Sequence, residues 1–351
     1  MKEKRVLVAM SGGVDSTAAA VLLQWAGYAC DGAMLQLYTD PDAPAAAADS
    51  ARDARQAAAH LGMDFYLFDE QALFREKVID AFCGEYLAGR TPNPCILCNR
   101  ALKFGALMDR ALTLGYDYIA TGHYARVDYD EKAGLYRLLR GRDRRKDQSY
   151  VLYQLTQQQL SHLLLPIGDT DKAAVRALLE KEGISLAQKP DSQDICFIPD
   201  GDYAAFLEKN GAVLTPGDFV DEKGTVLGRH RGIPCYTLGQ GKGLGIALGR
   251  HVYVTGKDSA RNTVTLGDNA ALFSRQLTAR EVNWIAGTPP AAPIPCTAKT
   301  RYSQQEAACV ATPLPEGRLA VEFEDPQRAI TPGQAVVLYL GDAVLGGGTI
   351  E

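Results

Sequence analysis

Residues 6–25 read Val-Leu-Val-Ala-Met-Ser-Gly-Gly-Val-Asp-Ser-Thr-Ala-Ala-Ala-Val-Leu-Leu-Gln-Trp. The apolar run Val6–Met10 has the character of a strand, and the glycine turn Ser11–Ser16 separates it from the helix-like stretch Thr17–Trp25. A strand, a glycine turn and a helix start in this order direct several unpaired backbone N–H groups and a helix N-terminus to one point. An ordinary strand-to-helix turn is the alternative, but the stretch favours a phosphate-binding loop.

The loop does not have the Gly-Lys-Ser/Thr ending of a Walker loop, which disfavours kinase and GTPase chemistry. Ser11–Ser16 resembles instead the PP-loop of the ATP pyrophosphatases. Those enzymes split ATP into AMP and pyrophosphate in order to activate a carbonyl oxygen as its adenylate. The resemblance implies the same use of ATP here.

Composition sets broad limits on the protein. A length of 351 residues predicts two or three domains, and 46 % hydrophobic residues are enough for ordinary globular cores. The sequence contains no run of 18 apolar residues, so no transmembrane helix is expected. The first residues show no targeting pattern. Eight cysteines in a chain of this size are expected to be thiols rather than a disulfide framework. We expect a monomeric cytoplasmic enzyme with no membrane contact.

Residues 1–200 alternate between strand-like and helix-like segments, which predicts an α/β fold with a doubly wound parallel sheet. The strand-like runs are Arg5–Met10, Ala29–Leu37, Asp64–Phe68 and Tyr116–Ala120. The helix-like stretches are Thr17–Trp25, Ser50–Leu61, Glu70–Ala88, Phe104–Leu114 and Lys172–Glu182. Between the second strand and its helix, Asp40–Ala48 is too long for a tight connection and is interpreted as a loop, a candidate substrate lid.

Two smaller β-rich parts are predicted after residue 200. Residues 201–272 are rich in glycine turns and short strands, such as Val252–Val254 and Thr263–Leu266, which indicates a small β-rich central domain. Residues 273–351 contain short strands at regular spacing with Pro and Gly breaks, which predicts a C-terminal β-barrel. The expected strands are Glu281–Ile285, Thr297–Tyr302, Ala307–Ala311, Arg318–Phe323, Ala335–Leu340 and Ala343–Gly347.

Two cysteine-bearing segments are candidates for chemistry. Thr91–Arg100 contains Cys95 and Cys98, and a helix predicted to begin near Arg100 would lower the pKa of Cys98 through its dipole. A buried thiol pair or half of a zinc site are the alternatives, but the chain has no second Cys-x-x-Cys. Cys196, between Ile195 and Phe197, is by itself more typical of a core residue.

A basic cluster crosses residues 137–146, with Arg137, Arg140, Arg142, Arg144, Arg145 and Lys146, although the net charge of the chain is −5. Such a cluster is often a solvated loop. A local basic patch on an acidic protein can still bind phosphates, because counterion release depends on local charge.

A set of short motifs in a fixed order identifies a family. They are Ser11–Ser16, Thr91–Pro94, Cys98-Asn99, Thr121–Ala125, Lys146–Tyr150, Asp194–Phe197, Tyr236–Gln240, Gly243–Gly245, Lys299–Tyr302 and Pro332–Gln334. Together they resemble the tRNA-specific 2-thiouridylases over essentially the whole chain. The resemblance implies thiolation of the wobble uridine of tRNA anticodons, with ATP, Mg²⁺, an anticodon stem-loop, and a sulfur donor such as a cysteine desulfurase or a relay protein.

The same resemblance implies roles for individual residues. Cys196 would carry sulfur as a persulfide, and Cys98 would be its partner thiol, with a Cys98–Cys196 disulfide as one product. ATP contacts would come from Ala9, Met10, Ser11, Gly12, Gly13, Val14, Asp15, Ser16, Leu35 and Gly122, with Asp15 and Ser16 as phosphate or magnesium partners. Contacts with tRNA would come from Asn93, Pro94, Cys95, His123, Lys146, Asp147, Gln148, Arg301, Tyr302 and Gln334, the first three lining the target base.

Cys95 departs from the pattern, because many members have an aspartate there. Some PP-loop tRNA thiolases hold an iron–sulfur cluster on three cysteines, so a cluster on Cys95, Cys98 and Cys196 is an alternative to the persulfide route. Two other classes share the PP-loop. A small-molecule synthetase would adenylate a carboxylate and would not require Cys98 or Cys196. A non-catalytic tRNA-binding module would not release pyrophosphate.

Overall fold

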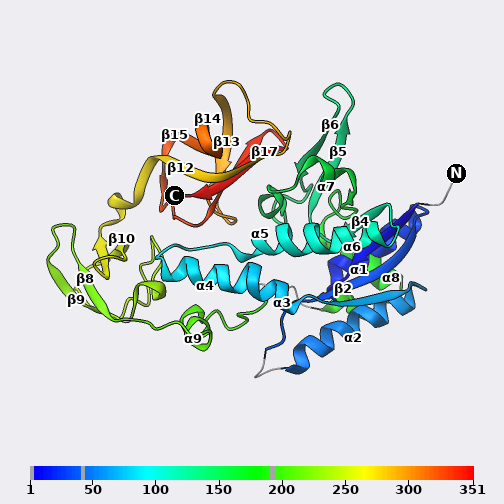
Figure 1. The fold of residues 1–351 in the computed structure, drawn as a ribbon, viewed down its shortest axis with the longest axis horizontal. Helices are drawn as coiled ribbons and strands as arrows, with labels where there is room; N and C mark the ends of the chain where they lie inside the picture. The colour runs from blue at the N-terminus through cyan, green and yellow to red at the C-terminus, as the bar shows by residue number, and fades with distance from the viewer. Residues whose placement is uncertain (1–3, 41–43, 190–194) are drawn as a thin grey trace.

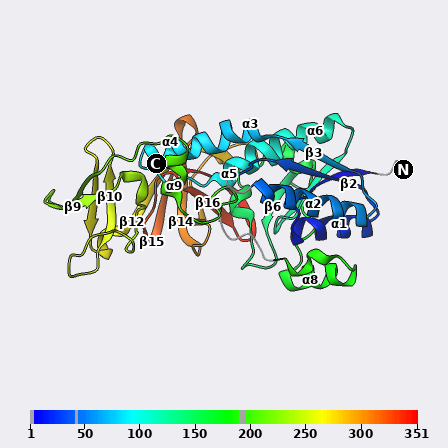
Figure 2. The same ribbon diagram turned by 90° about the horizontal axis from the view of Figure 1, so that it is seen from below.

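In the computed structural model, which describes residues 4–40, 44–189 and 195–351, the chain forms three parts in a row (Figure 1). The parallel sheet and its helices lie at one end, the small sheet of the central part lies at the other, and the C-terminal barrel lies between them. Figure 2 shows the same order from below. Among the described residues, no helix is both long enough and apolar enough to cross a membrane.

The N-terminal sheet is parallel throughout, with the strand order β3–β2–β1–β4–β7. Its strands are β1 (Arg5–Ala9), β2 (Ala29–Gln36), β3 (Phe65–Asp69), β4 (Tyr118–Thr121) and β7 (Leu163–Leu164). The central strand has no exposed side chain at Val6, Leu7 or Val8. Burial on both faces explains why this strand is continuously apolar, and it confirms the predicted doubly wound sheet.

Helices cover both faces of this sheet. On one side, α1 (Val14–Trp25) packs against α8 (Lys172–Lys181), and α2 (Pro44–His60) lies over β2. The predicted loop Asp40–Ala48 was too long, because α2 already begins at Pro44; residues 41–43 lie outside the described part. Proline is favoured at the first position of a helix and alanine in its interior, so Pro44 and the following alanines extend the helix rather than the loop.

A second helical layer begins after β3. The expected helix over residues 70–88 is present as α3 (Gln71–Phe74), a π-helical turn η1 (Arg75–Ile79) and α4 (Asp80–Leu87). The next helix is continuous through α5 (Pro94–Cys98), the π-helical stretch η2 (Asn99–Ala106) and α6 (Leu107–Thr113). We call this continuous helix, residues 94–113, the cysteine helix.

The predicted start of the cysteine helix near Arg100 was wrong. It begins at Pro94, where Asn93 is the N-cap and its Oδ1 accepts a hydrogen bond from the Cys95 backbone N–H at 3.2 Å. An asparagine N-cap followed by proline is a favoured helix start. Cys95 and Cys98 therefore lie inside the helix and not in front of it.

The remaining connections of the N-terminal part are β5 (Ala125–Asp130), β6 (Leu135–Arg140) and α7 (Gln157–Ser161), with 3-10 turns η3 (Ser149–Leu152) and η4 (Ser185–Gln188). The central part begins with α9 (Tyr203–Lys209). Its sheet has the order β10–β11–β8–β9, with β8 (Gly217–Val220), β9 (Val226–His230), β10 (Tyr253–Asp258) and β11 (Thr263–Gly267). Phe219, Val254 and Val264 form its core without exposed surface.

The C-terminal part is a closed barrel, as predicted. Its strands are β12 (Phe273–Trp284), β13 (Ile294–Lys299), β14 (Ala307–Leu314), β15 (Arg318–Arg328), β16 (Ala335–Leu340) and β17 (Ala343–Ile350). The barrel closes because β12 pairs with both β15 and β17. Leu319, Val336 and Leu338 fill its interior without exposed surface.

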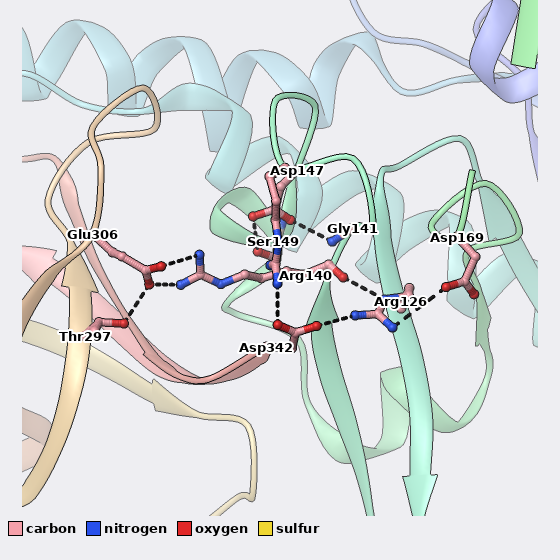
Figure 3. Close-up of polar contacts among 10 residues, drawn as sticks. Arg126, Arg140, Gly141, Asp147, Ser149, Asp169, Thr297, Glu306 and Asp342 are labelled. Carbon is pink, nitrogen blue, oxygen red and sulfur yellow. Dashed lines mark hydrogen bonds and ion pairs between the residues drawn. The ribbon is translucent and has the colours of Figure 1, made fainter. Parts of the chain in front are cut away.

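The hairpin β5–β6 joins the N-terminal part to the barrel. Its edge pairs with β17 at Leu139 and Ala343, so the two parts share one hydrogen-bonded sheet. Ion pairs reinforce this joint (Figure 3): Arg140 pairs with Glu306, while Arg126 and Arg144 both pair with Asp342. The Arg140 guanidinium also lies 3.8 Å from the centre of the Tyr339 ring.

These pairings change the interpretation of the basic cluster. Arg140 and Arg144 bind carboxylates of the barrel, and Arg137 binds Asp128 on the neighbouring strand. Much of the positive charge is therefore neutralised within the fold. Arg142 and Arg145 remain exposed, but Arg145 lies 3.5 Å from the Asp143 carboxylate. Among the described arginines of the cluster, Arg142 is the one for which no ion pair is found, and it remains a candidate for a phosphate contact.

Replacing Glu306 tests how much the joint stabilises the fold. Burial alone would raise the pKa of Glu306, but the Thr297 hydroxyl and Arg140 reverse this and hold the pKa below its usual value. A carboxylate whose pKa is lowered on folding stabilises the protein above its unfolded pKa of about 4.3, and this contribution is lost as the pH falls through the folded pKa.

Glu306→Gln should lower the free energy of unfolding by about 2 kcal/mol at pH 7, because Arg140 is left buried without a counter-charge; partial exposure of Glu306 reduces the effect. Urea unfolding between pH 7 and pH 3 should show this difference shrinking below about pH 4. The matched control is Glu131→Gln in the exposed turn of the same hairpin. An equal loss in both variants would contradict the assignment.

Candidate active site

The phosphate-binding loop lies at the carboxyl end of β1, the central strand. Gly12 adopts a left-handed φ of 69°, and the Lys189 ammonium group donates to its carbonyl oxygen at 2.8 Å. Gly13 is the N-cap of α1, and no side chain caps this N-terminus. The N–H groups of the first turn are therefore available to an anion, together with the positive end of the helix dipole.

Side chains hold the loop in place. The Ser16 hydroxyl accepts a hydrogen bond from the Ser11 backbone N–H at 3.1 Å. The Asp15 carboxylate accepts from the Lys172 ammonium group at 2.7 Å and from the Tyr124 hydroxyl at 2.8 Å. Asp15 thus fixes the loop through its own protein partners. Sequence reasoning missed Lys172 and Lys189, since both come from segments more than 150 residues away in the chain.

Gly122 brings the end of β4 against the loop. A Cβ atom on Gly122 would lie 2.5 Å from the Asp15 carbonyl carbon and 2.6 Å from the Ser16 nitrogen. The strand order changes direction between β1 and β4, which is where ligands bind in open parallel sheets. Leu35 lies near the end of β2, on the other side of β1. The structure thus brings Ala9–Ser16, Leu35 and Gly122 to one edge; their contact with ATP stays a prediction.

Gly122→Ala should weaken ATP binding, because the added methyl group must displace backbone at the start of α1. A displacement of about 1 Å at a positioning element can lower a reaction rate about 100-fold, and we expect a loss of affinity for ATP of similar order. Calorimetric titration with ATP measures the change. Gly84→Ala is the control, because a Cβ atom at Gly84 in α4 meets nothing within 4 Å. An unchanged affinity in Gly122→Ala would contradict the proposed contact.

Cys98 and Cys196 reach the same region from different segments. Cys98 is buried in a cluster with Phe74, Phe82 and Phe197. The Phe197 ring meets those of Phe74 and Phe82 edge to face, at centroid distances of 5.6 Å and 5.4 Å. Because Cys196 precedes this anchored phenylalanine, its exposed thiol is held near the cysteine helix. The core-like surroundings of Cys196 in the sequence thus reflect the burial of Phe197.

The pKa values of Cys98 and Cys196 are raised, and that of Cys98 is not lowered as expected. Desolvation by burial raises the pKa of Cys98, so the predicted depression by a helix N-terminus was wrong. Desolvation, followed by repulsion from Cys98 and Cys95, raises the pKa of Cys196 to about 12. Cys95 and Cys98 thus both act on Cys196, and Cys95 acts on Cys98. All eight cysteines are free. Among the described residues, no group of three or more His, Cys, Asp or Glu side chains is placed to hold a metal ion.

Six of the ten residues predicted to contact tRNA fall into two groups. In the first group, the side chains form hydrogen bonds within the protein. The Asp147 carboxylate accepts from the Gly141 N–H and from Ser149. Arg301 donates to the carbonyls of Leu238 and Ala329. Gln148 pairs with Tyr124, and buried His123 binds the Thr121 hydroxyl at 2.7 Å. Desolvation lowers the pKa of His123 well below its usual value, so this imidazole is neutral.

Tyr302 and Lys146 form the second group, with accessible side chains. Tyr302 is 42 % exposed, and its ring lies edge-on to Tyr150 at 5.9 Å. Desolvation, followed by repulsion from Asp147 and Cys95, raises the pKa of Tyr302. Lys146 is partly exposed beside Asp147. All these contacts with tRNA stay predictions, and exposed Tyr302 and Lys146 are the better candidates for direct contact.

The barrel also touches the segment just before Asn93. Gln334 Nε2 donates to the Thr91 carbonyl at 2.9 Å, and the Thr91 backbone N–H donates to the Pro332 carbonyl at 2.9 Å. Gly333, with φ of 91°, allows this approach, since a Cβ atom would lie 2.9 Å from the Thr91 nitrogen. We call this contact of residues 332–334 with Thr91 the barrel clamp. It fixes the position of Asn93, Pro94 and Cys95.

Comparing Gly333→Ala with a control glycine should distinguish the cost of the steric clash at the barrel clamp from the cost of backbone strain. An alanine at positive φ costs about 1–2 kcal/mol at any site. Gly287→Ala is the control, because Gly287 has φ of 83° and open space around its Cβ position. Gly333→Ala should lower the melting temperature further than Gly287→Ala does. Equal melting temperatures of the two variants would show that the barrel clamp accommodates the added methyl group without loss of stability.

Comparison with known proteins shows the family to which this chain belongs. Residues 4–200 match the family described as tRNA methyl transferase HUP domain, residues 204–268 its PRC-barrel domain, and residues 274–350 the aminomethyltransferase β-barrel domain. A protein of Acetivibrio thermocellus named tRNA-specific 2-thiouridylase MnmA is 48 % identical over 359 residues, covering 100 % of both chains. The chain belongs to the tRNA-specific 2-thiouridylase family.

A second member of this family, from Moorella thermoacetica, is 49 % identical over 352 residues and covers 98 % of this chain and 99 % of its own. Among solved structures, the U34-tRNA thiolase NcsA of Methanococcus maripaludis, described with its [4Fe-4S] cluster, is 18 % identical. It covers 59 % of this chain and 66 % of its own, with a TM-score of 0.36. That likeness is too weak to support a shared site.

Proposed function

We propose that this protein is an ATP-dependent sulfurtransferase that converts the wobble uridine of tRNA anticodons to 2-thiouridine. The observation that carries the proposal is the pair Cys98 and Cys196: Cys98 and Phe197 belong to one aromatic cluster, and the charge of Cys98 acts on Cys196. The same chain has a PP-loop followed by a helix N-terminus that no side chain caps. A small-molecule synthetase would have no use for this thiol pair.

The first half-reaction makes the uracil carbonyl reactive. Its O2 atom attacks the α-phosphate of ATP, pyrophosphate leaves, and the N3 proton is lost, which gives an O2-adenylated uridine. The N–H groups at the start of α1 and the positive helix end stabilise the phosphate charge in this step. AMP is a far better leaving group than a carbonyl oxygen.

The second half-reaction delivers sulfur. A persulfide donor first transfers its outer sulfur to Cys196, which is exposed and accessible to a partner protein. The Cys98 thiolate then attacks the inner sulfur of the Cys196 persulfide, so a Cys98–Cys196 disulfide forms and hydrosulfide leaves. Hydrosulfide adds to C2, AMP departs, and the sulfur-bound proton moves to N3. A dithiol reductant must reopen the disulfide by taking up two oxidising equivalents.

The described residues offer little protein ligation for a metal. Asp15 already binds Lys172 and Tyr124, so a magnesium ion would be held largely by phosphate oxygens and water, as is usual for Mg²⁺. Cys95, Cys98 and Cys196 are not arranged to hold one metal ion. The iron–sulfur alternative is tested separately, by the iron and sulfide content of anaerobically purified protein.

The three parts of the chain would divide the work. Residues 1–200 would carry out adenylation and sulfur transfer, residues 201–272 would connect, and residues 273–351 would contact tRNA. An anticodon loop suits this site, because bases in a loop leave their stack at low cost. The protein would act as a cytoplasmic monomer.

The decisive experiment is nucleoside mass spectrometry of unmodified tRNA incubated with the protein, ATP and a persulfide donor. The parent protein should form 2-thiouridine. Cys98→Ser and Cys196→Ser should reduce the product at least about 100-fold while pyrophosphate release continues, because the nucleophilic sulfur, and not the adenylation, is lost. Cys30→Ser is the matched control, since Cys30 lies in β2 away from the cysteine cluster.

Each alternative class gives a different result in this assay. Product formation by the double serine variant at the parental rate would overturn the sulfur route. Pyrophosphate release without tRNA but with a small carboxylate would identify a synthetase, and no release at all would identify a binding module. Iron and sulfide in anaerobically purified protein, lost in Cys95→Ala, would favour the cluster.

A further inference from the structure

Lys103 is a charged residue in the middle of the site to which no function has been assigned. It lies half-buried on the cysteine helix, and among the described residues no carboxylate forms an ion pair with it. The two lysines at the nucleotide loop differ, since Lys172 pairs with Asp15 and Lys189 with Asp53. A half-buried cation without a counter-charge is unfavourable at rest. Its position suggests a negative partner that is present only during the reaction.

The packing of its neighbours shows where Lys103 points. Leu102 packs into the aromatic cluster with Phe197, next to Cys196. The Phe104 ring lies 5.9 Å from the His123 ring, next to Gly122. Lys103 therefore leaves the helix between the segment that carries the sulfur and the loop that follows β4.

The π-helical stretch η2 changes which residues of the cysteine helix share one face. In an α-helix, residues five apart point in well separated directions, whereas the i→i+5 pattern of η2 brings them closer to one face. Cys98 and Lys103 are five residues apart, and η2 follows Cys98 directly. The same pattern is present at its end, where Leu107 N–H binds the Leu102 carbonyl. Such π-helical turns are frequent at functional sites.

The electrostatic surroundings agree with this geometry. Desolvation raises the pKa values of Cys95, Cys98 and Cys196, and the charge of Lys103 lowers each of them. Desolvation also lowers the pKa of His123, and Lys103 lowers it further. One cation thus acts on four groups from three segments. The charge of Cys95 also acts on Tyr302 of the barrel, whose pKa is raised first by desolvation and then by Asp147 and Cys95.

We propose that Lys103 is the fixed cation of the sulfur-transfer centre, stabilising the negative charge that moves from the Cys98 thiolate to the departing hydrosulfide. This inference rests on the proposed function. The charge stays at minus one throughout: the Cys98–Cys196 bond forms, the inner-to-outer sulfur bond of the Cys196 persulfide breaks, and the electron pair leaves on hydrosulfide. Lys103 acts on the reaction through the charge of the thiols and does not itself touch the reacting atoms. It is therefore a positioning residue whose effect is electrostatic.

The first test needs neither tRNA nor ATP. Alkylation of Cys196 by iodoacetamide is followed by mass spectrometry between pH 7 and pH 10 in the full-length protein and in Lys103→Met, Lys103→Gln and Lys103→Arg. Loss of a nearby opposite charge raises a thiol pKa by about one unit or more, so the neutral variants should react about tenfold more slowly at pH 8. Lys103→Arg should react like the parent, as should the control Lys132→Met in the exposed β5–β6 turn.

The second test separates sulfur transfer from adenylation. Lys103→Met and Lys103→Gln should form 2-thiouridine about 10-fold to 100-fold more slowly, with unchanged KM for tRNA and unchanged tRNA-dependent pyrophosphate release. Lys103→Arg should recover much of the rate. Circular dichroism melts show which variants are folded, and Lys103→Gln replaces Lys103→Met if the latter is unfolded.

Specific outcomes would overturn the inference. One is parental alkylation of Cys196 in both neutral variants. Another is an Arg variant as slow as the neutral variants, which would show that shape rather than charge matters. If the alkylation shift appears but no variant, including the parent, forms 2-thiouridine, the electrostatic role of Lys103 stands and the proposed function fails.

Discussion

The barrel clamp is the contact on which the geometry of the site depends. Two hydrogen bonds at Thr91 and a longer one from Gln334 to the Pro92 carbonyl hold the chain just before the cysteine helix against the turn of residues 332–334. The direction of the helix that carries Cys95 and Cys98 is thereby set by the C-terminal part, although both cysteines belong to the N-terminal part. The barrel is thus more than an added binding module, since it completes the framework around the thiols.

The cysteine helix in turn connects the surroundings of the thiols with the nucleotide loop. Its first turns lie beside Cys196, and Phe104, further along, packs on His123 next to the nucleotide loop. Resting thiols with raised pKa values react slowly with stray oxidants and electrophiles, because the thiolate is the reactive form. Burial of Cys98 therefore slows its reaction with such reagents in the resting protein.

The sequence indicated the local features well and the long-range ones poorly. Apolar runs such as Val6–Met10 predicted the parallel sheet, because strands buried on both faces require them. The start of the cysteine helix was predicted near Arg100, and the signal that was missed is Asn93-Pro94, since asparagine is a good N-cap and proline suits the first helical position. The pairing of Arg140 with Glu306, or of Lys189 with Gly12, depends on tertiary packing, and no local pattern encodes it.

The shared sheet between β6 and β17 has a consequence for biosynthesis. About 200 residues separate Leu139 from Ala343, so at 5–20 residues per second the ribosome needs roughly 10–40 s to supply the missing neighbour. Meanwhile the nascent hairpin exposes an open strand edge, a surface prone to intermolecular pairing. Arg137 and Arg140 on that strand act as gatekeepers during the interval, since charged side chains at an unpaired edge discourage aggregation.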